Sequence, residues 1–301
     1  MLFSILIPTY NNEKTIAKTI ESALNQDYNG DFEIVIVNNA STDSTLSIIQ
    51  SYNDSRIKLF TNETTVHMYE NHNICIKKAQ GDYVIFCHSD DELMPEALKI
   101  LAQKIEERMY PQRYILWGHS MFRDFSFSLS SVGGLSTNKM FSGVVAKQVF
   151  INNGLTPSGT CFSRQAMRDL GGFPIVEGTY DIDLIFEAIA AFEGWEFEML
   201  DRLLYKREYA STYSDDILPD IRNKQMMIAA SYIYNHLNTL QKQELEKMYW
   251  NNQAYLFHHI FAKPLPTKQE RLDALMLRYK RAPWKVWKLI KWILVRWNIW
   301  K

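Results

Sequence analysis

The chain has 301 residues, a formal net charge of −1 and 47% hydrophobic residues. This length holds one large domain or two small ones, and the composition is that of an ordinary globular protein. The near-neutral charge gives no general attraction to nucleic acid, so no nucleic-acid partner is expected. Cys75, Cys87 and Cys161 stand singly, which predicts buried free thiols in a reducing cytoplasm. No signal peptide is expected, and no run approaches the roughly 18–20 apolar residues of a transmembrane helix.

Strand and helix patterns alternate over residues 1–90. Apolar runs at 2–7, 32–37, 57–60 and 83–87 predict buried strands, and helical spacing of apolar residues separates them at 13–25, 44–52 and 68–79. This alternation predicts βαβ units and a parallel sheet. Polar loops rich in Asn, Ser, Thr and Asp follow three of these strands. Because ligands of open α/β sheets bind at the carboxyl ends of the strands, these loops form the predicted site.

The fourth strand ends at an acidic stretch, HSDDE at residues 88–92. Neighbouring carboxylates repel one another unless a cation, a positive partner or water offsets them. A divalent cation that bridges a diphosphate suits such hard oxygen ligands. The alternative is an acidic helix N-terminus, with Ser89 or Asp90 as N-cap and Pro95 within the helix. The stretch alone favours neither.

The first strand is followed by neither Gly-x-Gly-x-x-Gly nor Gly-x-x-x-x-Gly-Lys. This absence disfavours dinucleotide-dependent redox chemistry and P-loop hydrolysis. A nucleotide would instead be held by side chains, with Tyr10 stacking on the base and Asn39 hydrogen bonding to its edge.

Four segments in register resemble the family 2 glycosyltransferases, inverting enzymes with the GT-A fold. They are residues 4–11 (SILIPTYN), 38–45 (NNASTDST), 73–83 (NICIKKAQGDY) and 88–91 (HSDD). The resemblance implies an α/β fold with a GT-A-like, Rossmann-type mixed sheet flanked by helices and followed by a C-terminal helical extension. It also implies a nucleotide-sugar site that comprises Pro8, Thr9, Tyr10, Asn11, Asn39, Asn73, Ser89 and Asp90.

Two residues depart from the family pattern. Asn39 replaces the aspartate that reads the nucleobase; its amide can accept from N3–H of uracil or thymine or donate to cytosine, and UDP- or dTDP-sugars are favoured. Asp90 matches the final aspartate of the family's Asp-x-Asp motif, the metal ligand, whereas His88 replaces the first. The implied cofactor is Mn²⁺ or Mg²⁺, and an imidazole ligand would favour Mn²⁺. Whether His88 or Glu208 ligates the metal stays open, and Asp91 and Glu92 are assigned to helix capping.

The second half carries the predicted catalytic base. Residues 177–184 (EGTYDIDL) resemble the family's Glu-Asp-x-Asp-Leu segment, and Asp181 takes the place of its base. A carboxylate there would remove the proton of an acceptor hydroxyl as it attacks the anomeric carbon. The structural alternative for Asp181 is an N-cap of the following helix, and both roles are compatible. Lys206 and Arg207 are candidates for pairing with the diphosphate, with solvated surface charge as the alternative.

The predicted organisation is a glycosyltransferase domain at 1–215, a helical extension at 216–282 and a terminal helix at 283–301. Within the first domain, residues 1–110 form the nucleotide-sugar half and 111–215 the acceptor half. The terminal segment carries five tryptophans, basic residues and no acid. On a helical projection its apolar and basic residues separate onto opposite halves. This pattern predicts a helix lying in an anionic membrane surface, and the alternative is packing on the protein's own core.

The implied function is metal-dependent, inverting transfer of a sugar from a nucleoside-diphosphate sugar to an acceptor hydroxyl. A glycan or lipid-linked acceptor in bacterial surface polysaccharide assembly is expected, with the enzyme peripheral on the cytoplasmic face of the cell membrane. A sugar nucleotidyltransferase is one alternative, although its Gly-rich, basic loop is missing after the first strand. A catalytically silent scaffold is the other, suggested by His88 and Asn39 at aspartate positions, but Asp90 and Asp181 argue against it.

Deleting residues 283–301 is expected to abolish binding to anionic vesicles, because the deletion removes both the basic and the Trp-rich face of the predicted helix. Co-sedimentation of the full chain and the deletion variant with such vesicles measures this. Unchanged binding of the deletion variant would refute the membrane role.

Overall fold

The computed structural model describes residues 1–122, 127–128, 138, 140–151, 155, 157–207, 219–251 and 253–261. Contacts group Met1–His258 into one compact unit and His259–Lys301 into a second. Three predicted features lie outside the described residues: the membrane helix, Glu208 and most of the loop at 122–141. What the sequence predicts for them is not tested by the structure. No helix in the described ranges is long and apolar enough to span a membrane.

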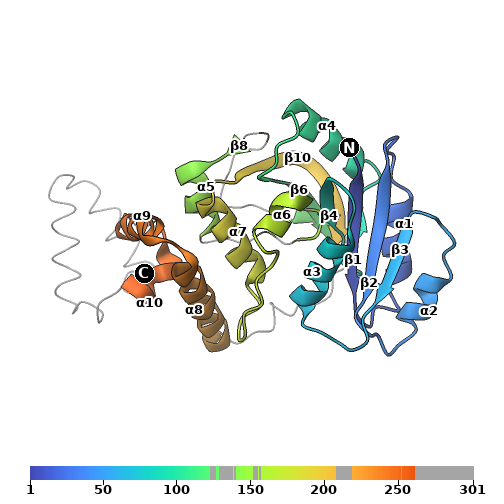
Figure 1. Ribbon diagram of the computed structural model, residues 1–301, viewed down its shortest axis with the longest axis horizontal. Helices are drawn as coiled ribbons and strands as arrows, with labels where there is room; N and C mark the ends of the chain where they lie inside the picture. The colour runs from blue at the N-terminus through green and yellow to red at the C-terminus, as the bar shows by residue number, and fades with distance from the viewer. Residues whose placement is uncertain are drawn as a thin grey trace, which may run out of the picture. The chain divides into compact units, whose positions relative to one another are not determined.

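A mixed sheet forms the centre of the first unit (Figure 1). Its strands are β1 (Phe3–Thr9), β2 (Phe32–Asn38), β3 (Ile57–Thr61), β4 (Tyr83–Phe86), β5 (Glu92–Leu93), β6 (Tyr114–Phe122), β7 (Phe127–Ser128), β8 (Met140–Phe141), β9 (Cys161–Ser163) and β10 (Glu196–Arg207). Over the described residues their order is β3-β2-β1-β4-β9-β6-β10-β5, with β7 paired to β6 and β8 to β10. The predicted mixed sheet is therefore confirmed.

The described residues also form helices, and those that precede residue 193 flank the sheet (Figure 1). They are α1 (Ile16–Leu24), α2 (Thr45–Gln50), α3 (Met68–Lys78), α4 (Ala97–Glu107), α5 (Gly143–Phe150), α6 (Arg164–Asp169), α7 (Ile182–Phe192), α8 (Pro219–His236), α9 (Thr239–Trp250), the 3₁₀ turn η1 (Tyr255–Phe257) and α10 (His258–Phe261). The region predicted as a helical extension is helical in α8 and α9, which belong to the same compact unit as the sheet.

The first four strands run parallel, as their alternation with helices predicts. β1 pairs with β2 from Phe3↔Phe32 to Thr9↔Asn38, and it pairs with β4 through Leu6↔Phe86. In-register parallel strands end at the same edge of a sheet. The loops after β1, β2 and β4 are thereby brought together at that edge. The sheet changes direction beyond β4, which pairs antiparallel with β9.

The acidic stretch after β4 does not begin a helix. Glu92 and Leu93 form β5, which pairs antiparallel with β10, and α4 starts only at Ala97 with Glu96 at the N-cap position. The capping role predicted for Asp91 and Glu92 is therefore wrong. The physical reason is Leu93, which is 4% exposed in the core and draws the chain into the sheet before the helix starts.

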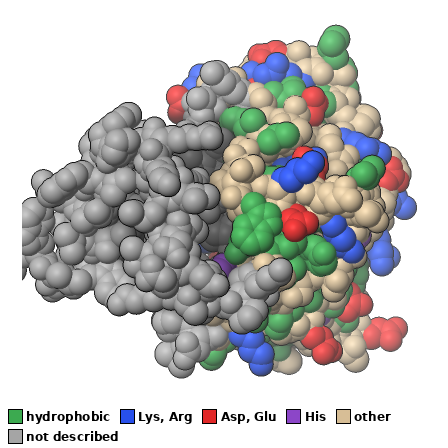
Figure 2. Space-filling model, turned by 90° about the vertical axis from the view of Figure 1, so that its left-hand side faces the viewer, with side chains coloured by type: hydrophobic (Ala, Val, Ile, Leu, Met, Phe, Trp, Pro, Cys, Tyr) green, Lys and Arg blue, Asp and Glu red, His purple; other side chains and the backbone are tan. Residues whose placement is uncertain are grey.

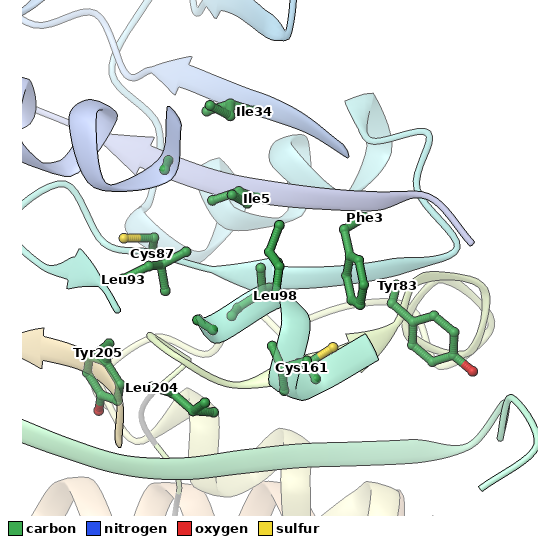
Figure 3. Packing of buried hydrophobic residues seen from close by; sticks show 14 of the residues in the cluster. Phe3, Ile5, Ile34, Tyr83, Cys87, Leu93, Leu98, Cys161, Leu204 and Tyr205 are labelled. Carbon is green, nitrogen blue, oxygen red and sulfur yellow. The ribbon is translucent and has the colours of Figure 1, made fainter. Parts of the chain in front are cut away.

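Alternate residues of β1, β2 and β4 pack on one face of the sheet under α1, α2 and α4 (Figure 3). Phe3, Ile5 and Ile34 show the alternation, and all three are fully buried. Burying a side chain of this size stabilises the fold by about 1.5–3 kcal/mol. The predicted burial of the three cysteines is confirmed, and each is a free thiol.

An aromatic cluster covers the opposite face of β4. The Phe173 ring lies 5.7 Å from Phe86, 5.0 Å from Phe186 and 5.3 Å from Tyr69, measured between centroids. These residues come from α3, β4, α7 and the segment before α7. Their packing fixes α3 and α7 beside the strand whose end carries the acidic stretch. On the surface, Figure 2 shows positive and negative side chains interspersed with hydrophobic ones over the described part of one face.

A buried carboxylate, Glu198, joins the end of α4 to β6 and β10. Arg108 donates two hydrogen bonds to it, at 2.9 and 2.8 Å, and the Tyr114 hydroxyl donates a third at 2.6 Å. The Lys104 ammonium lies 4.0 Å away. Burial alone raises the pKa of Glu198, but the hydrogen bonds from Arg108 and Tyr114 and the nearby positive charges outweigh it and hold this pKa below its ordinary value.

Replacing Glu198 by Gln is expected to lower the free energy of unfolding by about 2 kcal/mol at neutral pH, because a buried charged acceptor is lost. The folded pKa lies below the unfolded value of about 4.3, so the carboxylate contributes fully above that pH and loses its contribution as the pH falls through the folded pKa. The difference between the wild-type protein and Glu198→Gln should therefore shrink below about pH 4.3. Urea unfolding followed by circular dichroism measures it.

The matched control is Glu107→Gln on the same helix end. Glu107 pairs with Lys104 at 2.5 Å, but its side chain is 61% exposed. Exposed ion pairs contribute little because water solvates both charges. Equal losses of stability in the two variants would contradict the role of Glu198.

Candidate functional site

The loops after β1 and β2 form one connected surface. The Asn11 amide donates to Ser41 Oγ at 3.0 Å, and Asn11 Oδ1 accepts from the Thr42 amide at 2.8 Å. The Asn12 amide donates to Thr45 Oγ1 at 2.8 Å. Side chains of each loop satisfy the main chain of the other, and this holds the two loops in a fixed relation.

Ser89, a predicted donor-binding residue, joins the loop after β4 to the same surface. Its hydroxyl donates to Asn12 Oδ1 at 2.6 Å, and its carbonyl accepts from Thr15 Oγ1 at 2.8 Å. Thr19 Oγ1 donates to the Asp91 carbonyl at 2.8 Å. The three loops at the carboxyl ends of β1, β2 and β4 are thus linked. Asn12, which was not among the predicted site residues, is the partner they share.

Pro8 and Thr9 are buried at the end of β1, where the Thr9 carbonyl accepts from the Asn39 amide at 2.8 Å. Tyr10 follows them and is 46% exposed. An exposed aromatic ring is accessible to a base, and the stacking predicted for Tyr10 stays a prediction. Pro8 and Thr9 shape the edge through their main chain.

The side chain of Asn39 is 4% exposed and already engaged. Its Nδ2 donates to the Val66 carbonyl and its Oδ1 accepts from the Val66 amide, both at 2.9 Å. Oδ1 also accepts from Asn62 Nδ2 at 2.9 Å. Both lone pairs of Oδ1 are therefore occupied, and the second hydrogen of Nδ2 is the group that this amide can offer a ligand.

Three side chains able to ligate a metal ion meet after β4. One ring nitrogen of His88 and carboxylate oxygens of Asp90 and Asp91 lie within 4.8 Å of one another. Asp91 is 6% exposed and belongs to this cation cluster, not to a helix cap. Two carboxylates and one imidazole form a donor set that fits Mn²⁺, whereas Mg²⁺ prefers oxygen ligands throughout.

The surroundings favour a neutral His88. Burial lowers the pKa of His88; the carboxylate of Asp90 opposes this shift, and the positive charge of Arg207 adds to it. A neutral imidazole keeps a lone pair with which it can ligate a cation. The charge of Arg207 thus acts on His88, and the pairing of Arg207 with a diphosphate stays a prediction.

A second histidine, His72 on α3, contacts His88. Their Nε2 atoms are 3.1 Å apart, and His72 Nδ1 lies 2.8 Å from the Met68 carbonyl oxygen. Burial lowers the pKa of His72 to about 3, and the interaction with His88 adds to the shift. His72 was not predicted as a site residue. The run Asn71-His72-Asn73 in a helix that packs on the sheet was the missed signal, since three consecutive polar residues cannot all face solvent.

Asn73, predicted to bind the donor, holds the segment before α7. Its Nδ2 donates to the Phe173 carbonyl at 2.7 Å, and its Oδ1 accepts from the Phe173 amide at 2.8 Å. Gly172 adopts a φ of 74°, and a Cβ at this position would collide with Asn73 Oδ1. Both polar atoms of the Asn73 amide thus have a structural use, and its contact with a donor stays a prediction.

Asp181 occupies the N-cap position of α7 and is 6% exposed. Its side chain makes no cap hydrogen bond to the helix, and its Oδ2 accepts from Thr179 Oγ1 at 3.3 Å. Asp181 therefore stands at the N-cap position, as the structural alternative predicts, but its side chain does not cap the helix by a hydrogen bond.

Tyr69 lies between two parts of the site: it interacts electrostatically with acids of α7, and its ring contacts His72. Burial raises the pKa of the Tyr69 phenol, and the negative charges of Asp183, Glu187 and Asp181 raise it further. The ring of Tyr69 also lies 5.1 Å from the ring of His72. One side chain is thus within electrostatic reach of the predicted base and in contact with the residue behind the cation cluster.

Glu187, on α7, is a buried acid that the sequence did not single out. It is 1% exposed, and its Oε2 accepts from the Leu155 amide at 2.6 Å. Burial raises the pKa of Glu187 well above its ordinary value, and the charge of Asp183 adds to the shift.

The arrangement can support transfer from a diphosphate-activated donor. A cation at His88, Asp90 and Asp91 would offset the charge of a diphosphate, with Tyr10 at the same edge of the sheet for a base. The carboxylate of Asp181 is able to accept a proton from a nucleophile. Each group lies on a loop or helix end that the sheet positions.

A protein-family model described as "Glycosyl transferase family 2" matches residues 4–115 of the chain. This range contains the loops after β1, β2 and β4. EpsE of Bacillus subtilis, whose name also assigns it to the glycosyltransferases, is 30% identical over 210 residues, which are 67% of this chain and 71% of EpsE.

Two further relatives match over shorter stretches. TarS of Staphylococcus aureus, named poly(ribitol-phosphate) beta-N-acetylglucosaminyltransferase, is 39% identical over 110 residues, 36% of this chain and 19% of TarS. WfgD of Escherichia coli, named UDP-Glc:alpha-D-GlcNAc-diphosphoundecaprenol beta-1,3-glucosyltransferase, is 39% identical over 90 residues, 30% of this chain and 35% of WfgD. The chain spans well under two thirds of the length of these two proteins.

Solved structures of TarS residues 1–349 share the fold. One has a TM-score of 0.65 at 25% identity and covers 90% of this chain and 77% of that one. The complex of the same fragment with UDP-GlcNAc has a TM-score of 0.66 at 24% identity and covers 90% and 78%. This likeness confirms the predicted GT-A-like fold. By its matched segment, its relative EpsE and this architecture, the chain belongs to glycosyl transferase family 2.

Proposed function

We propose that the chain transfers a sugar from a nucleoside-diphosphate sugar to an acceptor hydroxyl, with inversion at the anomeric carbon and with the aid of a divalent metal ion. The observation that carries the proposal is the meeting of His88, Asp90 and Asp91 at the carboxyl edge of the sheet. Such a cluster beside loops able to hold a nucleotide suits a diphosphate leaving group. Family membership favours glycosyl transfer over the nucleotidyltransferase alternative, and the presence of Asp181 favours catalysis over a silent scaffold.

A UDP- or dTDP-sugar is the proposed donor. The occupied Oδ1 of Asn39 leaves an N–H group of Nδ2 for a base. This group can donate to a ring carbonyl oxygen of uracil, thymine or cytosine and does not choose among them. The exposed ring of Tyr10 would stack on the same base. The bound UDP-GlcNAc in the TarS complex supports a uridine donor for a chain of this fold.

Asp181 is the proposed base. It takes the proton of the acceptor hydroxyl while the oxygen attacks the anomeric carbon opposite the departing nucleoside diphosphate, and inversion follows from this single displacement. When bound at His88, Asp90 and Asp91, Mn²⁺ would supply positive charge to the leaving diphosphate. Arg207, whose charge acts on His88, would supply a second positive charge to the diphosphate.

We propose a lipid-linked or polymeric glycan as the acceptor, in bacterial surface polysaccharide assembly on the cytoplasmic side of the membrane. The names of TarS and WfgD, which specify a poly(ribitol phosphate) and an undecaprenol diphosphate, support this class of acceptor. The basic, Trp-rich segment at 283–301 would hold the enzyme at the surface where lipid-linked acceptors lie.

Release of nucleoside diphosphate from a panel of nucleotide sugars, with Mn²⁺ and a membrane extract as acceptor source, tests the activity. Asp181→Asn is expected to lower turnover about 10²–10⁴-fold, because the amide cannot accept the hydroxyl proton. Binding of the donor should persist in this variant, as measured by calorimetry with a non-reacting donor analogue.

The matched control for the base is Asp183→Asn. Asp183 lies in the first turn of the same helix, and its Oδ1 accepts from the Leu184 amide at 2.8 Å. This variant should stay within a few-fold of the wild-type turnover. Full activity of Asp181→Asn, or no release from any donor in the panel, would refute the proposed reaction.

The ligand atoms of His88, Asp90 and Asp91 predict that the enzyme prefers Mn²⁺ over Mg²⁺, and that this preference depends on His88. Chelation by EDTA should abolish turnover, and Mn²⁺ should restore it better than Mg²⁺. In His88→Asp the turnover with Mg²⁺ should approach the turnover with Mn²⁺, because an all-oxygen site suits Mg²⁺. The control is Glu92→Gln, a neighbouring acid outside the cluster, which should keep the wild-type preference. An unchanged preference in His88→Asp would exclude His88 as a ligand.

A further inference from the structure

The hydrogen bonds around His72 determine which ring nitrogen donates and which accepts in its contact with His88. His72 Nδ1 lies 2.8 Å from the Met68 carbonyl oxygen, which has lone pairs and no hydrogen. His72 Nδ1 must therefore carry the proton of this bond. In the neutral ring the other nitrogen, Nε2, then has a lone pair and is an acceptor.

Packing keeps the His72 ring in this orientation. Its centroid lies 5.1 Å from the ring of Tyr69, 5.3 Å from Phe86 and 6.0 Å from Phe173. His72 is 4% exposed, so a charged ring would lose most of its hydration without an acidic partner among these neighbours. The aromatic neighbours thus hold a neutral imidazole whose Nε2 points at His88.

The same reasoning then fixes the proton on His88. His72 Nε2 accepts, so His88 Nε2, at 3.1 Å, must donate. With the opposite tautomer, two lone pairs would face each other across that distance. The main chain of His88 is held separately, because its amide donates to Ser158 Oγ at 3.1 Å. A neutral His88 with its proton on Nε2 keeps its one ring lone pair on Nδ1.

We propose that His72 is a positioning residue that fixes His88 in the Nε2–H tautomer, so that Nδ1 of His88 completes a cation site with Asp90 and Asp91. The inference rests on the proposed function for the identity of the ion, but the hydrogen-bond chain stands without it. One ring nitrogen of His88 lies within 4.8 Å of carboxylate oxygens of Asp90 and Asp91, and the tautomer assigns the ligating lone pair to Nδ1 because Nε2 carries the proton. Partners that orient a ligating histidine change metal affinity by about 10–100-fold when they are removed.

The tautomers are tested directly in the metal-free full-length chain labelled with ¹⁵N-histidine. Long-range ¹H–¹⁵N correlation spectra distinguish the two tautomers, and the signals missing from His72→Gln and His88→Asp assign the two rings. We expect His72 in the Nδ1–H form and His88 in the Nε2–H form. A proton on Nδ1 of His88 overturns the proposal, whatever the chain does with a nucleotide sugar.

The effect on the cation site is measured by titrating Mn²⁺ against the full chain and following the free ion by electron paramagnetic resonance. His72→Leu removes the acceptor and should weaken Mn²⁺ binding about 10–100-fold. His72→Gln offers an amide oxygen to His88 Nε2–H and should recover most of that affinity. His67→Asn is the control, because asparagine preserves the N-cap of α3 while removing a nearby imidazole.

The outcomes separate the inference from the proposed reaction. Loss of Mn²⁺ affinity in His72→Leu with recovery in His72→Gln supports the positioning role even if no donor in the panel is used. Wild-type affinity in His72→Leu, or equal weakening in the Leu and Gln variants, overturns it even if the enzyme transfers sugar. Absence of Mn²⁺ binding to the wild-type chain also overturns it. Circular dichroism confirms that each variant compared is folded.

Discussion

Three consecutive side chains of α3 join the parts of this site. Asn71 donates to the Val37 carbonyl near the end of β2, His72 contacts His88 after β4, and Asn73 bonds the main chain of Phe173 before α7. Successive residues of a helix point about 100° apart, so a single turn can reach three directions. One helix therefore supports the end of β2, the cluster of His88, Asp90 and Asp91, and the segment that leads to Asp181.

The loops themselves hold strain that their cross-links must offset. Asn11 and Ala40 adopt φ values of 53° and 54°, in the left-handed region that favours glycine. Each such residue costs roughly 1–2 kcal/mol, and asparagine tolerates it better than alanine. The Asn11 amide donates to Ser41 Oγ and Asn11 Oδ1 accepts from the Thr42 amide, and these two hydrogen bonds hold the strained turns together. Backbone strain held by neighbouring contacts is typical of segments whose shape serves a ligand.

The sequence predicts the parallel half of the sheet well, because buried strands and amphipathic helices leave strong local periodicities. It also locates Tyr10, His88, Asp90 and Asp181, since each follows the end of a strand or starts a helix. Asp91 was assigned to a cap because adjacent acids look alike along the chain, and only the pairing of β5 with β10 turns Asp91 inward. His72 could not be predicted from the sequence, because its role depends on its hydrogen bond with His88. The spacing of residues along the chain does not reveal such a contact. The engagement of Asn39 by Val66 likewise arises from a loop far from it in sequence.

The separation in sequence of the paired strands has a kinetic consequence. β1, β2 and β3 pair with their neighbours in the chain, as in Phe3↔Phe32 and Ile34↔Ile57. β4 instead pairs with β1 and with β9 across much longer stretches, Phe3↔Tyr83 and Tyr83↔Ser163. Closing a long loop costs more chain entropy before any contact rewards it, so sequence-local units are favoured to form early. We therefore expect β1, β2 and β3 to form the nucleus of folding, onto which β4, β9 and the helix with Asp181 at its N-cap position dock later. From Ser4 onward these three strands lie within the matched family segment at residues 4–115.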